Sequence, residues 1–180
     1  MISVFMVVLL VILSSIVSFQ LGKTKVVLPD YPPAGTVRAF CTSCVDLRFV
    51  DTEMAAFENE FGVNSFDIFV APGPSLALAS NSTALFATEF ATAWDRGLSV
   101  SQMVNGTSVA VLCDHENCGY FSASISSYAT GSYLERKQIQ FAEMSKTLNY
   151  LTDYYAPPDY NVTFSGMWIG LDGSVEQVPF

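Results

Sequence analysis

The sequence contains little charge, and positive charge is especially scarce. Of its 180 residues, 8 are lysine or arginine and 17 are aspartate or glutamate, which gives a net charge of −9. Nucleic acids and anionic membrane surfaces repel such an acidic protein, so we expect neither as a partner. Charged residues make up only 14% of the chain and apolar residues 51%. This composition argues against disorder and predicts a domain with a buried core.

The N-terminal segment has no charge at all. Residues 2–19 are apolar or uncharged, and the first basic residue is Lys23. We expect residues 1–22 to be a signal peptide or a membrane anchor. The absence of a basic residue before the run weakens the signal-peptide interpretation, and an uncleaved anchor would favour a cytosolic domain. A proline-rich linker is predicted over 23–35, followed by a folded domain over 36–180.

Three glycosylation sequons favour the secretory pathway. They begin at Asn81, Asn105 and Asn161, and each has a threonine two residues later. Such triplets also occur by chance, so they are suggestive only. We expect a secreted or lumenal protein whose leader is cleaved, with a membrane-anchored protein as the alternative.

Short apolar strands alternate with amphipathic helices in the rest of the chain. This alternation predicts an α/β fold with a mostly parallel sheet of about four strands and flanking helices. Leu171-Asp172-Gly173 predicts the turn of a C-terminal antiparallel hairpin. Neither an internal repeat nor a second domain is visible. The predicted strands are 36–43, 66–71 and 108–113, and the predicted helices are 52–61, 82–96 and 133–151.

Polar residues and glycines predict where these helices end. Asp51 is a possible N-cap of the first helix and Gly62 its end, and Gly97 is expected to close the second helix. Acidic residues such as Glu53 and Asp67 are expected on a solvated face.

The four cysteines and the single histidine are grouped in two short segments. Cys41 and Cys44 form one group, and Cys113 and Cys118 flank His115 in the other. A domain this large and apolar does not need disulfides, so the grouping indicates a metal site. The carboxyl ends of parallel strands meet at one edge of a sheet. Cys44, His115 and Cys118 then offer two thiolates and an imidazole, a ligand set for Zn2+ that leaves a position for water.

Asp46 and Arg48 follow Cys44 at alternate positions. In an extended chain Asp46 points to the same side as Cys44, where its carboxylate can accept a hydrogen bond from hydroxide on the zinc. Zinc lowers the pKa of its bound water to about 7, which supplies this hydroxide at neutral pH. Arg48 would hold Asp46 ionised and oriented. The alternative is an ordinary ion pair at the end of a strand.

A structural zinc site made of four thiolates is a competing interpretation. Cys41 and Cys44 have the C-x-x-C spacing of zinc knuckles, and Cys113 and Cys118 would complete the site. It leaves His115 without a role, so we expect Cys41 and Cys113 to be small buried residues instead. In an oxidising compartment these two cysteines could pair as a disulfide.

The segments "CVDLR" (44–48) and "HENCG" (115–119) together resemble the paired signature of the β-class carbonic anhydrases. The resemblance extends over residues 36–178, including the late strand pair. It implies reversible hydration of carbon dioxide to bicarbonate and a proton, and it implies a homodimer. In some members the aspartate that matches Asp46 binds zinc and closes the site. The implied zinc ligands are Cys44, His115 and Cys118, and the implied orienting dyad is Asp46 and Arg48.

Several features depart from the family pattern. Residues 23–35 are too short and proline-rich for the family's N-terminal helical arm, and residues 71–74, the glycine segment after the second strand, lack the family's usual asparagines. Glu116 adds negative charge beside a ligand, which could raise the pKa of a zinc-bound water. No second histidine is present to shuttle protons. Two alternatives remain open: a hydrolase of a sulfur analogue of carbon dioxide, and a non-catalytic zinc-binding protein.

Overall fold

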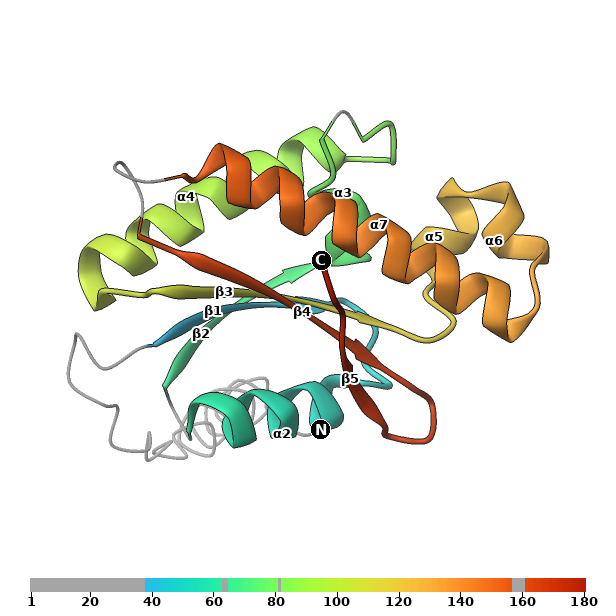
Figure 1. The fold of residues 1–180 in the computed structure, drawn as a ribbon, viewed down its shortest axis with the longest axis horizontal. Coiled ribbons are helices and arrows are strands. Elements are labelled where there is room, and N and C mark those ends of the chain that lie inside the picture. Colours follow the sequence, from blue (N-terminus) through green and yellow to red (C-terminus); the bar gives the residue numbers. More distant parts are fainter. Residues whose placement is uncertain (1–37, 63–64, 81, 157–160) are drawn as a thin grey trace, which may run out of the picture. The chain divides into compact units, whose positions relative to one another are not determined.

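The structure is a computed structural model, shown as a ribbon in Figure 1. The predicted leader (1–22) and linker (23–35) lie outside the residues that it describes. Within those residues, no helix is both long and apolar enough to cross a membrane. The described residues are 38–62, 65–80, 82–156 and 161–180.

The centre of the described fold is a five-stranded sheet. Its strands are β1 (Ala39–Cys44), β2 (Phe66–Ala71), β3 (Val109–His115), β4 (Thr163–Ile169) and β5 (Val175–Gln177). They lie in the order β2-β1-β3-β4-β5, with β1 to β4 parallel and β5 antiparallel to β4. This arrangement confirms the predicted α/β fold, including its antiparallel strand at the C-terminus.

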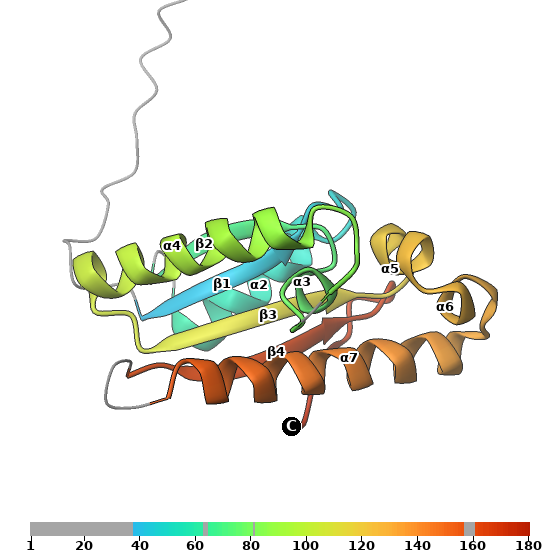
Figure 2. The same cartoon turned by 90° about the horizontal axis from the view of Figure 1, so that it is seen from above.

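Helices cover both faces of the sheet. They are α2 (Val50–Phe61), α3 (Pro74–Ala77), α4 (Ala87–Asn105), α5 (Gly119–Ser124), α6 (Ser126–Thr130) and α7 (Tyr133–Tyr154). Figure 1 shows α2 on one face and α3, α4 and α7 on the other. Figure 2 shows α5 and α6 beyond the end of the sheet where β3 finishes. The short helices α3, α5 and α6 were not predicted, because four to six residues carry too little periodicity.

The alternating side chains of the strands separate two apolar cores. Phe40 of β1 points toward α4 and α7 and belongs to one cluster with Trp94 and Leu148. Its neighbour Cys41 points the other way and belongs to a second cluster with Phe57 of α2. Both faces of β1 are therefore buried, and its two polar residues, Thr42 and Ser43, are buried as well. Cys44, at the carboxyl end of β1, belongs to a third buried cluster with Cys118 and Phe121.

Two predicted helix ends are wrong. No side chain caps the start of α2: Phe49 occupies the N-cap, and Asp51 lies inside the first turn. The second helix does not end at Gly97, because α4 continues through it. Gly97 instead permits close packing on β1, since a Cβ there would lie 3.0 Å from Cζ of Phe40. The predicted end of α2 at Gly62 is confirmed, with φ of 94°.

Candidate metal centre

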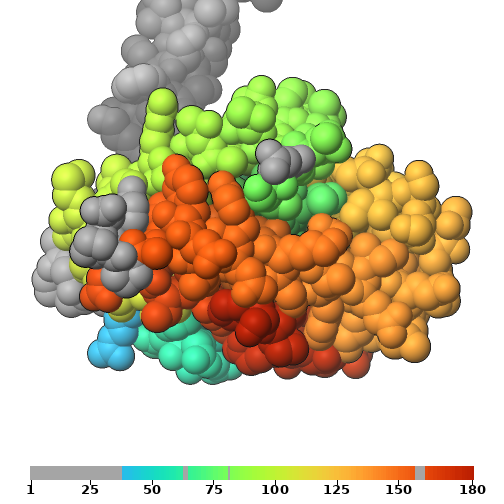
Figure 3. All heavy atoms as spheres, turned by 45° about the horizontal axis from the view of Figure 1, so that its top comes forward, coloured from blue at the N-terminus to red at the C-terminus, as the bar shows by residue number. Residues whose placement is uncertain are grey.

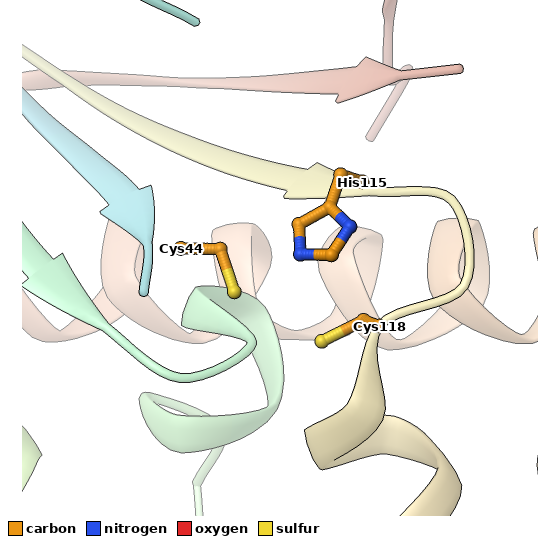
Figure 4. Close-up of side chains that lie close together, drawn as sticks. All are labelled: Cys44, His115 and Cys118. Atoms are coloured by element: carbon orange, nitrogen blue, oxygen red, sulfur yellow. The ribbon is translucent and has the colours of Figure 1, made fainter. Parts of the chain in front are cut away.

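Three potential metal ligands converge at the carboxyl end of the sheet. Cys44 is the last residue of β1, His115 the last of β3, and Cys118 the N-cap of α5. Their ligand atoms all lie within 4.8 Å of one another, and Figure 4 shows the two thiols and the imidazole gathered around a common space. The three residues are 2%, 0% and 2% exposed. The structure thus brings together the predicted ligand set and makes a cluster that can hold a metal ion.

The ring of His115 is fixed in an orientation suited to metal binding. Its Nδ1 lies 2.9 Å from the carbonyl oxygen of Glu116. A carbonyl can only accept, so Nδ1 donates and Nε2 carries the free lone pair. The ring also stacks on Phe49, with 4.1 Å between centroids. Nε2 is buried and has no hydrogen-bond partner among the described residues. A buried lone pair without a partner is costly, and a metal ion would satisfy it.

The sulfur of Cys44 receives a hydrogen bond from the loop after β2. The backbone N–H of Gly73 donates to Sγ at 3.4 Å. Gly73 has φ of 49°, and a Cβ there would lie 3.1 Å from Cδ1 of Tyr120. A larger residue would therefore be both strained and crowded. The segment 71–74, which departs from the family pattern in sequence, supplies a donor to a predicted ligand.

The two clustered thiols are electrostatically unequal. The pKa of Cys44 is lowered to about 4, chiefly by the hydrogen bond from Cys118 and also by His115, although burial acts in the opposite direction. The same hydrogen bond, with burial, raises the pKa of Cys118. Without a metal ion, the pair therefore holds a single proton at neutral pH. One thiolate is already available to a cation.

Asp46 and Arg48 form a bidentate ion pair beside the cluster. Nε of Arg48 donates to Oδ1 of Asp46 at 2.9 Å, and Nη2 donates to Oδ2 at 2.5 Å. These hydrogen bonds lower the pKa of Asp46 to about 2. Oδ2 of Asp46 lies 3.9 Å from Nε2 of His115. Nη2 of Arg48 also reaches the carbonyl oxygen of Asn117 at 3.4 Å, so the pair joins the two predicted motif segments.

Cys41 and Cys113 do not belong to the cluster. Both are 0% exposed and lie in the apolar core next to α2. Burial raises the pKa of each thiol, and all four cysteines are free. The four-thiolate arrangement is therefore absent from the part of the chain described here, and the prediction that Cys41 and Cys113 are small buried residues is confirmed.

The turn that carries Cys118 is held by neighbouring elements. The N–H of Glu116 donates to the carbonyl oxygen of Ile169 at 2.8 Å. The Glu116 carboxylate accepts from the N–H of Leu171 at 3.0 Å, so it is directed toward the β4–β5 turn. The N–H of Cys118 donates to the hydroxyl of Tyr128 at 3.2 Å. These contacts position the second predicted motif against β4 and α6.

A buried glutamate behind Cys44 was missed. Glu53 is 1% exposed, so the expectation of a solvated face is wrong for this residue. Its carboxylate accepts from the hydroxyl of Ser43 and from the backbone N–H of Cys44, the latter at 3.4 Å. Burial raises its pKa. The signal was available, because Glu53 lies one helical turn before Phe57, on the same buried side of α2.

Asp114 is a second buried acid that was not singled out. It is 0% exposed and accepts from both the hydroxyl and the backbone N–H of Ser75 on α3. Burial raises its pKa to about 7. A lone aspartate inside an apolar strand, next to a predicted ligand, was the available signal.

A cavity of about 430 Å³ lies away from the metal cluster. It is lined by α3, α4 and the C-terminal end of α7, on the side shown in Figure 3. Trp94, Asp95 and Tyr155 contribute to its wall, and none of the five predicted site residues does. The three clustered residues are buried, and they lie apart from this cavity.

Several solved structures of β-carbonic anhydrases have a similar fold. A β-carbonic anhydrase from Trichomonas vaginalis has a TM-score of 0.50 and 15% identity, covering 94% of this chain and 96% of its own. One of two tetrameric β-carbonic anhydrases from Sordaria macrospora has a TM-score of 0.55 and 11% identity, covering 99% and 98%. The enzyme CafA of Aspergillus fumigatus has a TM-score of 0.51 and 11% identity, covering 79% and 75%. No protein-family model and no curated protein matches the sequence.

The fold and the cluster together define an α/β protein with a buried cysteine–histidine centre able to bind a metal ion. More specifically, the fold is β-carbonic-anhydrase-like, which confirms the resemblance seen in the two motifs at the level of fold. The tetrameric assembly is described for the Sordaria macrospora proteins. A homodimer of this chain stays a prediction.

Proposed function

We propose that this chain binds zinc and catalyses the reversible hydration of carbon dioxide to bicarbonate and a proton. One observation carries the proposal: the buried Cys44–His115–Cys118 cluster meets the Asp46–Arg48 ion pair at the carboxyl end of the sheet.

The residues of the cluster fit a zinc ion. Two cysteine sulfurs and one histidine nitrogen are ligand types that zinc takes in proteins, and the buried Nε2 of His115 has no other partner among the described residues. When bound with an open fourth position, zinc lowers the pKa of a water molecule to about 7 and so supplies hydroxide at neutral pH.

Asp46 would orient the attacking water. Because Arg48 keeps its pKa at about 2, the Asp46 carboxylate is ionised at neutral pH and can only accept hydrogen bonds. Accepting one from the water turns an oxygen lone pair toward the carbon atom of the substrate. Arg48 holds the carboxylate in this orientation through two hydrogen bonds. Asp46 is too acidic to keep the released proton, and the chain has a single histidine, so we expect a dependence of the rate on buffer concentration.

A non-catalytic zinc protein is the second candidate function. The near-complete burial of the three ligand residues favours it, because burial restricts the access of substrate to the ion. In that case the metal would contribute to folding stability alone. The Asp46–Arg48 pair would then be an ordinary ion pair at a strand end.

The experiment is stopped-flow hydration of carbon dioxide by the full-length chain between about pH 6.5 and 9, with zinc quantified in the same sample. We expect one zinc per chain and activity in the wild type, with zinc kept and activity lost in Asp46→Ala. The control is Asp51→Ala, an exposed aspartate of α2. Zinc without hydration across this range would favour the non-catalytic protein. Absence of zinc with the cysteines kept reduced would refute the site.

We also propose that the chain enters the secretory pathway. The uncharged run 2–19 and the sequons support this proposal. Asn161 is exposed and lies two residues before β4. The amide of Asn105 donates to Asp67 at 3.0 Å and Thr107 of the same sequon is buried, so we expect a glycan at Asn161 rather than at Asn105. Expression in eukaryotic cells followed by glycosidase treatment tests this: Asn161→Gln should reduce the mobility shift and Asn105→Gln should leave it unchanged, and an unglycosylated wild type would contradict the proposal.

A further inference from the structure

Two buried carboxylates lie behind Cys44, and the proposed chemistry uses neither. Glu53 approaches from α2 on one face of the sheet, and Asp114 points toward α3 on the other. The two acids have matching partners. Glu53 accepts from one serine hydroxyl, that of Ser43, and from one backbone N–H, that of Cys44. Asp114 accepts from the hydroxyl and the backbone N–H of Ser75.

Both sets of contacts lead to Cys44. Glu53 binds the backbone of Cys44 directly. Asp114 binds the first turn of α3, and the N–H of Gly73, two residues before Ser75, donates to Sγ of Cys44. Thr147 of α7 donates to the carbonyl oxygen of Ser75 at 2.8 Å, so α3 is also held from its outer side.

Burying these two acids costs free energy, and a functional role would account for their presence. Buried charges are unfavourable unless donors satisfy them, and apolar residues of similar size are often at least as stabilising in their place. A backbone N–H can only donate, so each acid acts as an acceptor toward one such group, that of Cys44 for Glu53 and that of Ser75 for Asp114. Their common feature is the link to Cys44, a residue of the metal cluster.

We propose that Glu53 and Asp114 are positioning residues that aim the sulfur of Cys44 at the metal ion. Two serine hydroxyls serve as links: that of Ser75 connects Asp114 to α3, and that of Ser43 holds Glu53, which itself accepts from the N–H of Cys44. The inference rests on the metal-binding part of the proposed function and not on carbon dioxide hydration. Groups that orient metal ligands in this way typically change metal affinity by about 10–100-fold when they are removed.

The test removes a single hydroxyl from each link. Ser43→Ala and Ser75→Ala leave all three metal ligands in place. The matched control is Ser101→Ala: Ser101 is also buried, at 3% exposed, and its hydroxyl also donates to a carboxylate, that of Asp67, at 2.6 Å. It lies on α4, and among the described residues its hydroxyl bonds to Asp67 and Thr107, away from the metal cluster. Zinc affinity of the full-length chain is measured by competition with a chelator, together with the Co2+–thiolate absorption band and metal-free stability.

We expect Ser43→Ala and Ser75→Ala to bind zinc about 10–100-fold more weakly than the wild type and to shift the Co2+–thiolate band. Ser101→Ala should lose comparable metal-free stability but keep the affinity and the band. Wild-type affinity in both site variants, or an equal loss in Ser101→Ala, would overturn the proposal.

A second pair of variants isolates the glutamate. Glu53→Gln keeps an acceptor oxygen for the N–H of Cys44, whereas Glu53→Ala removes it, so the glutamine variant should bind zinc more tightly. Equal affinities would overturn the role of Glu53. A wild-type chain that binds zinc but does not hydrate carbon dioxide would refute the proposed reaction and leave this inference standing, because its readouts are affinity and absorption.

Discussion

Two buried cysteines lie in the middle of the sheet and two at its carboxyl end, and the surroundings of the two pairs differ. Cys41 lies opposite Ile68 and Val111 of the neighbouring strands, so its backbone belongs to the sheet on both sides. Cys44 lies past the last β1–β3 pair and keeps only Ala71 as a partner. Burial is nearly complete in both regions. Burial alone therefore does not separate a structural cysteine from a ligand.

Hydrogen-bond donors make the difference. In the middle of the sheet the backbone N–H groups are used between strands, and burial raises the pKa of Cys41 and Cys113. At the carboxyl end the chain turns away, and an N–H such as that of Gly73 is free to reach a sulfur. There the pKa of Cys44 falls to about 4. Near the end of a strand, backbone N–H groups are available to bind a sulfur, whereas inside the sheet they pair with neighbouring strands.

The largest expected effect comes from removing the cysteines one at a time. Cys44→Ala and Cys118→Ala should each weaken zinc binding strongly, because each deletes a ligand. The loss of affinity should exceed the ~10–100-fold that is typical when a residue hydrogen-bonded to a ligand is removed. Cys41→Ala and Cys113→Ala should keep one zinc per chain and lose about 1 kcal/mol of unfolding free energy. Zinc content and denaturation midpoints measure both effects. Loss of zinc in Cys41→Ala would restore the four-thiolate site.

The next effect is the pH dependence of zinc affinity. The raised pKa of Cys118 keeps it protonated at neutral pH, whereas Cys44 has already lost its proton. Zinc binding therefore releases the Cys118 proton, and affinity should rise about tenfold per pH unit between about pH 7 and 9. Burial lowers the pKa of His115, but its contacts with Cys44 outweigh this and raise the pKa. At lower pH, zinc binding should therefore also displace a proton from His115, which makes the dependence of zinc affinity on pH steeper. Chelator competition at several pH values tests this, and a flat profile would contradict it.

The smallest expected effect comes from displacing the N–H of Gly73, which donates to the sulfur of Cys44. Gly73→Ala should weaken zinc binding by about tenfold, because the added Cβ meets Tyr120 and moves the N–H from Cys44. Gly106→Ala is the matched control: Gly106 also has a positive φ, 71°, but a Cβ there meets nothing within 4 Å. Both variants should lose about 1–2 kcal/mol of unfolding free energy from backbone strain. Equal zinc affinities in the two would show that the Gly73 N–H does not matter.

The sequence predicted the site better than its surroundings. The cluster was predictable because two motifs each follow an apolar strand, and parallel strands end at one edge of the sheet. Helix ends were less predictable: Gly97 reads as a stop, but its lack of a side chain serves close packing on Phe40. Glu53 was misplaced because its charge suggested solvent, whereas its partners Ser43 and Cys44 lie in β1, the strand that precedes α2. The docking of a helix on a neighbouring strand is not visible in the periodicity of either segment.

The fixed ring of His115 has a thermodynamic consequence. Its Nδ1, its stacked face and its backbone carbonyl are each engaged, the last by Gln140, which in turn accepts from Trp168. Little conformational entropy remains to be lost when an ion arrives, so the centre is preorganised. Small metal domains unfold when their ion is removed, but here two apolar cores persist without one. Chelation should empty the site and leave the circular dichroism spectrum of the folded chain unchanged.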